Sequence, residues 1–101
     1  MNGQQYLVTI NVHPLLEEAM VDCLLAIDAA EGFSSLAVNA HGSEHDTLSL
    51  AEQVAGRKKQ IRFQMYVPEQ QLDVLIEQLK LNFLGAGIRY WVMPVLESGY
   101  I

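Results

Sequence analysis

The strongest constraint on the fold is a strand–helix–strand pattern that occurs twice in the chain. Each copy has a segment of alternating apolar and polar residues, then an apolar stripe at helical spacing, then a second alternating segment. The segments span residues 6–12, 14–27 and 36–40 in the first copy and 60–67, 68–83 and 88–93 in the second. We therefore expect two βαβ units joined by one long connection.

Prolines and glycines mark where these elements begin and end. Pro14 and Pro68 suit the start of the two helices, where a missing N–H costs nothing, and His13 is the residue before the first helix. Gly85-Ala86-Gly87 ends the second helix, because glycine tolerates the left-handed cap conformation. Pro94 removes a ladder donor, so the last strand ends there or lies at a sheet edge.

This element order predicts an α+β fold, a ferredoxin-like βαββαβ sandwich in one domain over residues 1–101. We expect a four-stranded antiparallel sheet with both helices on one face. The other face is then uncovered, yet it carries apolar side chains, which favours an oligomer that buries them. These side chains are Leu7, Tyr66, Trp91 and Met93.

Charge, cysteine content and hydropathy narrow the class of protein. The net charge of −6 argues against binding to nucleic acid or to an anionic membrane. A single cysteine, Cys23, excludes an internal disulfide framework and fits the cytoplasm. No apolar run is long enough to insert into a bilayer, and the N-terminus does not resemble a signal peptide.

A basic cluster at the end of the long connection is the first candidate site. Arg57, Lys58 and Lys59 follow Gly56, and Arg62 lies on the next predicted strand. Guanidinium and ammonium groups suit phosphate oxygens, so this cluster predicts an anion site, to which Arg89 would add a donor beside the glycine turn at Gly87. The alternative is a solvated charge run that offsets the acidic residues of the same connection.

A second candidate site, for a metal, precedes the basic cluster. Imidazole and carboxylate groups together suit zinc, copper or nickel. The candidate ligands are His41, Glu44, His45 and Asp46. The alternative is a pair of exposed histidines on a polar loop, since the spacing alone is not diagnostic.

The sequence does not indicate an enzyme. No nucleophile with a plausible base or known catalytic motif is recognisable. Cys23 belongs to the apolar stripe of the first helix, where a thiol behaves as a small hydrophobe.

Two stretches carry a family resemblance that spans nearly the whole chain. They are "HGSEHDTLSLAEQVAGRKKQIRF" (residues 41–63) and "GAGIRYWVMPVLESG" (residues 85–99), and "LSLAEQVAGR" (residues 48–57) is the most specific part. The chain resembles the PII-like signalling protein superfamily, and within it a bacterial branch often encoded beside heavy-metal efflux systems.

The resemblance implies a homotrimer whose sheets line the centre and whose ligand clefts lie between subunits. It also implies that the connection at about 42–59 is a T-loop that docks onto a target protein, such as a membrane transporter or an efflux component. The implied ligand is an adenine nucleotide. We expect this ligand or another small anion to be bound by Gly42, Arg57, Lys58, Arg62, Gly87 and Arg89, by analogy with the family rather than by a match of each residue.

The sequence differs from PII proteins in two places, and a related family suggests another ligand. The connection has no tyrosine between Gly42 and Gln60, which argues against uridylylation-type control, and the glycine turn before Ile88 is short. Divalent-cation tolerance proteins share the trimeric fold, so a divalent metal stays the alternative ligand.

Overall fold

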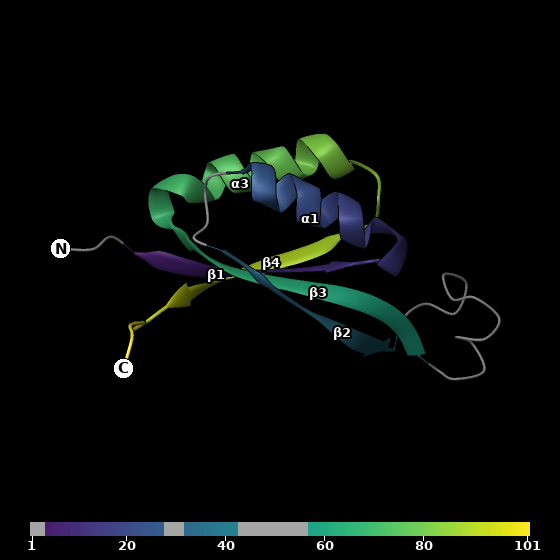
Figure 1. Cartoon of the computed structure of the whole chain (residues 1–101), viewed down its shortest axis with the longest axis horizontal. Helices are drawn as coiled ribbons and strands as arrows, with labels where there is room; N and C mark the ends of the chain where they lie inside the picture. Colours follow the sequence, from purple (N-terminus) through teal and green to yellow (C-terminus); the bar gives the residue numbers. More distant parts are fainter. Residues whose placement is uncertain (1–3, 28–31, 43–56) are drawn as a thin grey trace.

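The computed structural model describes residues 4–27, 32–42 and 57–101 (Figure 1). The elements follow the predicted order, with a short 3₁₀ helix (η1) ahead of the first α-helix. Their bounds are β1 Gln5–Val12, η1 Pro14–Leu16, α1 Glu17–Ala26, β2 Ser34–His41, β3 Arg57–Pro68, α3 Glu69–Phe83 and β4 Arg89–Val95.

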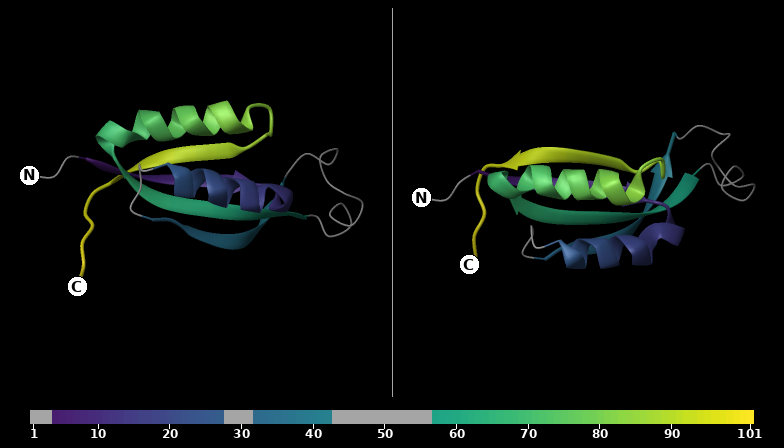
Figure 2. Two further views of the ribbon diagram at one scale, coloured as in Figure 1. Left: turned by 45° about the horizontal axis from the view of Figure 1, so that its top comes forward. Right: turned by 90° about the horizontal axis from the view of Figure 1, so that it is seen from above.

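The four strands form one sheet in the order β2-β3-β1-β4, and every neighbouring pair is antiparallel. Both helices lie on one face of this sheet (Figure 1). Helix α1 lies toward β2 and helix α3 toward β4 (Figure 2). The predicted ferredoxin-like α+β fold is therefore confirmed, including the uncovered second face.

The core lies between the helices and the sheet. Alternate residues of β1 and β3 point to the helices, which is the period-2 pattern of the sequence. The buried apolar side chains are Val8, Ile10, Val12, Met20, Leu24, Phe63, Met65, Val67 and Leu75. Phe33 closes one side of this core, with its ring 6.0 Å from the ring of Phe63.

The start of the first helical segment differs from the prediction. Leu15 was expected in the apolar stripe but is 86% exposed. Residues 14–16 form η1, and the three-residue turn of a 3₁₀ helix shifts the phase of the side chains relative to α1. His13 does precede the helix, and its Nδ1 accepts a hydrogen bond from the Leu15 N–H at 3.1 Å.

The hairpin of β2 and β3 is longer than predicted. β3 begins at Arg57, so Arg57, Lys58 and Lys59 are strand residues and the expected connection at 42–59 is shorter. They pair with His41, Ala40 and Asn39 beyond the last β1 partner, Ile61. Backbone hydrogen bonding to β2 is therefore enough to extend β3 at residues 57–60, although their side chains are not buried in the core. We call residues 38–41 and 57–60 the arm; it reaches past β1 and β4 (Figure 1). Residues 43–56 of the predicted connection lie outside the described residues.

The turn into β4 and the edge position of β4 match the sequence. Gly85 and Gly87 have φ of 79° and 72°, the left-handed region expected after α3. Pro94 lies in β4, which is an edge strand and tolerates a missing ladder donor. In the described part of the chain, no helix has the length and apolar character needed to cross a membrane.

Candidate functional site

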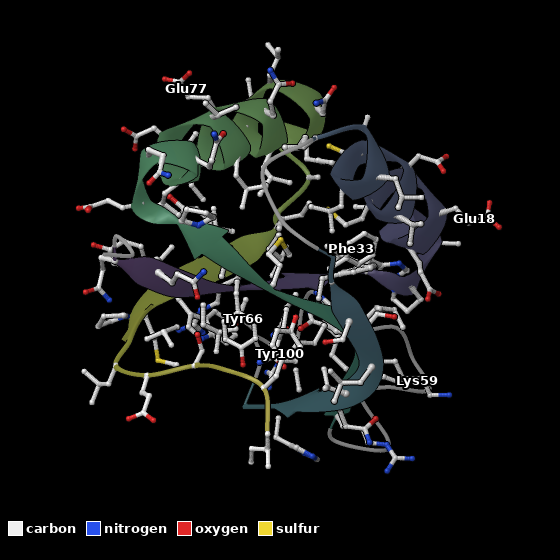
Figure 3. The ribbon with its side chains drawn as sticks, turned by 60° about the vertical axis from the view of Figure 1, so that its left-hand side comes forward. Glu18, Phe33, Lys59, Tyr66, Glu77 and Tyr100 are labelled. Carbon is white, nitrogen blue, oxygen red and sulfur yellow. The ribbon has the colours of Figure 1, made fainter. Side chains whose placement is uncertain are left out.

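Charge is separated between the two layers of the molecule. The described strands contain no Asp or Glu, but they hold five of the six basic residues. These are Arg57, Lys58, Lys59, Arg62 and Arg89. Helices α1 and α3 carry the acids Glu17, Glu18, Asp22, Glu69, Asp73 and Glu77, with Lys80 as their single base. Glu18 and Glu77 point outward from the helices (Figure 3). A chain of net charge −6 thus presents a basic sheet.

The uncovered face of the sheet, here called the open face, combines this charge with exposed apolar groups. Leu36, Tyr66 and Met93 are 46%, 55% and 47% exposed. The register places Tyr66 and Met93 on either side of Leu7, as the sequence predicted for this face. An apolar surface of this kind at the centre of a sheet is typical of an interface.

Arg62 and Arg89 come together on the open face. Asn11 of β1 pairs with Arg62 on one side and Arg89 on the other, so the three residues form one row across the sheet. Arg62 Nε donates a hydrogen bond to Asn11 Oδ1 at 2.9 Å. The Arg62 and Arg89 Cζ atoms lie 5.3 and 5.5 Å from the centroid of the Trp91 ring. Both guanidinium groups therefore make cation–π contacts with one indole.

The other predicted anion ligands lie away from this row. Arg57 is five residues before Arg62 on β3, a separation of about 17 Å along an extended strand. Lys58 is on the same face as Arg62 but about 14 Å along the strand, and Gly42 follows the end of β2. Within one chain, Arg62 and Arg89 thus lie in one row of the sheet, whereas Arg57 and Lys58 lie on the arm. Gly42 follows β2, and Gly87 lies in the turn before β4.

Gly87 lies beside a cavity of about 200 Å³ between α3 and the β4 edge. Its lining is mostly apolar, with Lys80 and Tyr90 as the side chains that carry polar groups. The lining includes Ile10, Met20, Ile76, Leu79, Phe83, Leu84 and Ile88. This cavity suits an apolar or flat group, whereas the cations of the sheet suit an anionic one.

The metal ligands predicted from the sequence are described only in part. His41 is exposed and pairs across the strands with Arg57. Glu44, His45 and Asp46 lie outside the described residues. Over the ranges that the structure describes, no three His, Cys, Asp or Glu side chains cluster as a metal site would require.

A second cavity combines Tyr66 of the open face with residues of the C-terminal tail, to which the sequence assigned no role. Tyr66 and Tyr100 lie on the open side of the sheet (Figure 3), and both line a cavity of about 480 Å³. The C-terminal tail reaches this place because Ser98 Oγ donates a hydrogen bond to Gln5 Oε1 at 3.1 Å. Nothing in the local sequence of the tail predicts this contact, since the partner is on β1.

Asn11 and Trp91 also contact the arginines of the open face, which the sequence did not predict. Trp91 was expected only as an interface residue, and Asn11 as a polar residue of the first strand. The open-face position of Asn11 follows from alternation, but its two arginine neighbours depend on the register of three strands.

A comparison with protein-family models gives one assignment. The model of DUF3240, described as a protein of unknown function, matches residues 2–101. The chain belongs to the DUF3240 family. None of the curated proteins with which the sequence was compared matches it.

Solved structures extend the likeness of this DUF3240 chain to PII-like proteins. A DUF3240 protein from Shewanella baltica OS155 is 25% identical, with a TM-score of 0.76 and coverage of 100% of this chain and 99% of the other. CPII from Thiomonas intermedia K12, a nitrogen regulatory PII-like protein bound to ADP, AMP and bicarbonate, is 17% identical with a TM-score of 0.72. It covers 97% of both chains. Arabidopsis thaliana PII bound to citrate is also 17% identical, with a TM-score of 0.69 and coverage of 92% and 78%.

These likenesses confirm the PII-like fold that the sequence predicted. At 17% identity they establish the fold of the DUF3240 chain, and the ligands named belong to those relatives.

Proposed function

We propose that this protein is a non-enzymatic, PII-like regulator that binds an anionic effector, an adenine nucleotide, between the subunits of a homotrimer. Effector binding would control a partner protein through the connection between β2 and β3. The observation that carries the proposal is the charge separation, since the strands hold five of six basic residues and no acid. An acidic protein with one basic layer is suited to concentrate a small anion there.

The ligands of structural relatives support the same chemical class. ADP, AMP and bicarbonate in CPII and citrate in the plant PII are all anions at neutral pH. The shared fold supports an anionic effector for this chain as well.

The neighbourhood of Gly87 supports a nucleotide in particular. The apolar cavity beside Gly87 offers a place for a base, and Arg89 follows two residues later on the open face. Gly87 itself has a positive φ, and no atom of the described residues lies within 4 Å of the position of a Cβ. A glycine there leaves the backbone accessible to a phosphate.

The continuity of β3 supports a route from effector to loop. This strand carries Arg62 beside Trp91 and, without interruption, Arg57 and Lys58 on the arm. A charge bound near Arg62 would change the electrostatic field at the arm and favour one conformation of the connection that follows Gly42. The arm residues would then contact either the effector of a neighbouring subunit or the partner protein.

The open face supports the assembly. Tyr66 and Met93 are about half exposed in the single chain, and a homotrimer with its sheets at the centre would bury them.

Isothermal titration calorimetry with ATP, ADP and AMP tests the binding step, and light scattering gives the oligomeric mass. We expect a trimer and saturable heat with at least one nucleotide. Arg89→Gln should weaken nucleotide binding by about tenfold or more, because a charge-assisted hydrogen bond is lost. Lys80 lines the cavity, so the control is Glu77→Gln, which changes one charge on the outer side of α3, away from the sheet and the cavity. A folded trimer that gives no heat at millimolar nucleotide rejects the proposal.

A further inference from the structure

The row Arg62–Asn11–Arg89 with Trp91 brings two cations close together on the open face. Arg62 and Arg89 are on strands that flank β1, so their backbones are about 10 Å apart. Both side chains lean over the same indole. Because each Cζ lies within 5.5 Å of one ring centroid, the two like charges repel each other, and an anion bound between them would offset this repulsion.

The donors of these two arginines are largely unused. A guanidinium group has five N–H donors. Within residues 4–27, 32–42 and 57–101, the side chain of Arg62 makes one hydrogen bond, from Nε to Asn11. Over the same ranges the Arg89 side chain has its contact with Trp91 and no hydrogen bond or ion pair. Because no described strand has a carboxylate, the sheet itself supplies no counter-charge.

Asn11 fixes one half of this arrangement. It is 9% exposed, and its amide oxygen accepts from Nε, which leaves the terminal N–H groups of Arg62 for another acceptor. The hydrogen bond at Nε already restricts the Arg62 guanidinium group. Ligand binding therefore costs less side-chain conformational entropy, and the site is partly preorganised.

We propose that Arg62 and Arg89, held against Trp91 and by Asn11, form a binding site for a compact oxyanion of the phosphate type. The two guanidinium forks match tetrahedral oxygens, and the anion offsets their mutual repulsion. The indole already contacts both guanidinium groups, so the ligand is recognised by its charge and oxygens rather than by stacking. Free phosphate and the phosphate of a larger molecule share this chemistry.

This inference shares Arg62 and Arg89 with the proposed nucleotide site, but it uses neither Gly87 nor its cavity. Its test uses inorganic phosphate, whereas the nucleotide proposal is tested with ATP, ADP and AMP, so either can fail alone. If ATP displaces phosphate, the phosphoryl groups of the nucleotide occupy this site; if both bind together, the site is for the free anion.

Trp91 provides a direct readout, because it is the chain's single tryptophan. The experiment is a titration of the full-length protein with sodium phosphate at constant ionic strength, followed by tryptophan emission and by calorimetry. An anion that draws the guanidinium groups from the indole changes its emission, so we expect a saturable change and saturable heat. Arg62→Gln and Arg89→Gln should each weaken phosphate binding by about tenfold or more.

Lys80→Gln is the matched control, since it removes one positive charge from α3 and should leave the phosphate affinity unchanged. Circular dichroism before each titration checks that every variant is folded. If Arg62→Gln is unstable, Arg89→Gln alone tests the proposal, because Arg89 is exposed and its substitution should not affect folding. The proposal is overturned if the parent protein gives no saturable heat with phosphate. It is equally overturned if a folded Arg89→Gln protein binds phosphate as tightly as the parent.

Discussion

Arg62 of β3 donates a hydrogen bond through Nε to Oδ1 of Asn11 on β1, at 2.9 Å on the side of the sheet away from the helices. Asn11 is 9% exposed, although no helix covers it. The long side chains of its neighbours in the row, Arg62 and Arg89, supply cover of the kind that amphipathic stems provide. The open face thus has polar contacts between its own side chains, which partly bury Asn11 without a helix above it.

Asn11→Ala should lower the free energy of unfolding, because it removes the acceptor of a charged donor in a partly buried place. A hydrogen bond to a charged group contributes about 1.5–3 kcal/mol. Urea unfolding at fixed protein concentration measures the change. Asn39→Ala on the exposed arm is the matched control and should change stability by less than about 0.5 kcal/mol. Equal effects of the two substitutions would contradict this role for Asn11.

Gly85→Ala should destabilise the protein by about 1–2 kcal/mol, because Gly85 has a φ of 79° and an alanine there is strained. In the part of the chain that the structure describes, no atom lies within 4 Å of the added Cβ, so the cost comes from the backbone conformation. Gly85→Asn should cost less, since asparagine visits this region more readily.

The matched control is Gly99→Ala, where the site is equally open and φ is not in the left-handed region. It should shift stability by less than about 0.5 kcal/mol in thermal unfolding. A neutral Gly85→Ala would mean that the turn adopts another conformation in solution.

The sequence predicted the sheet because alternation is a local signal. Val8, Ile10 and Val12 recur at every second position, and each is buried against the helices. The positive-φ turn at Gly85 and the edge strand at Pro94 are likewise set by one residue each. Leu15 was misjudged because a 3₁₀ turn and an α-helical turn differ by only about half a residue, so their patterns agree over a few positions.

The candidate site was predicted in its residue types but not in its arrangement. Arg62 and Arg89 are 27 positions apart, and only the register of both with Asn11 puts them in one row. The sequence places Arg57 to Lys59 in the connection, since their polarity gives no alternation of apolar residues that would face a core. Strand formation there depends on pairing with β2, which is a non-local property.

His13→Ala should weaken the start of the first helix. His13 Nδ1 accepts the Leu15 N–H, a donor that has no partner within the helix. Losing such a cap costs about 0.5–1 kcal/mol. His13→Asn keeps a short side-chain acceptor and should restore most of the loss, which chemical unfolding of the three proteins measures. A loss that asparagine does not restore would point to packing of the imidazole instead.

Cys23 should react slowly with thiol reagents at neutral pH. Burial between the helices raises the pKa of its thiol above the usual 9.0, and the Asn82 Nδ2 donor, 3.7 Å from Sγ, opposes this only in part. The thiolate is the reactive form, so the rate in the folded protein should rise with pH around a higher midpoint than in the unfolded chain.

The same pKa shift links pH to stability. Above about pH 9 the unfolded chain loses the thiol proton before the folded one does, so the free energy of unfolding should fall as pH rises further. Cys23→Ser removes this contribution and serves as the control, since the other groups that titrate there are retained. The measurements are the rate with a disulfide reagent across pH, native and in denaturant, and urea unfolding of both proteins. A native midpoint at or below that of the denatured chain would contradict the assignment of Cys23 to a desolvated site.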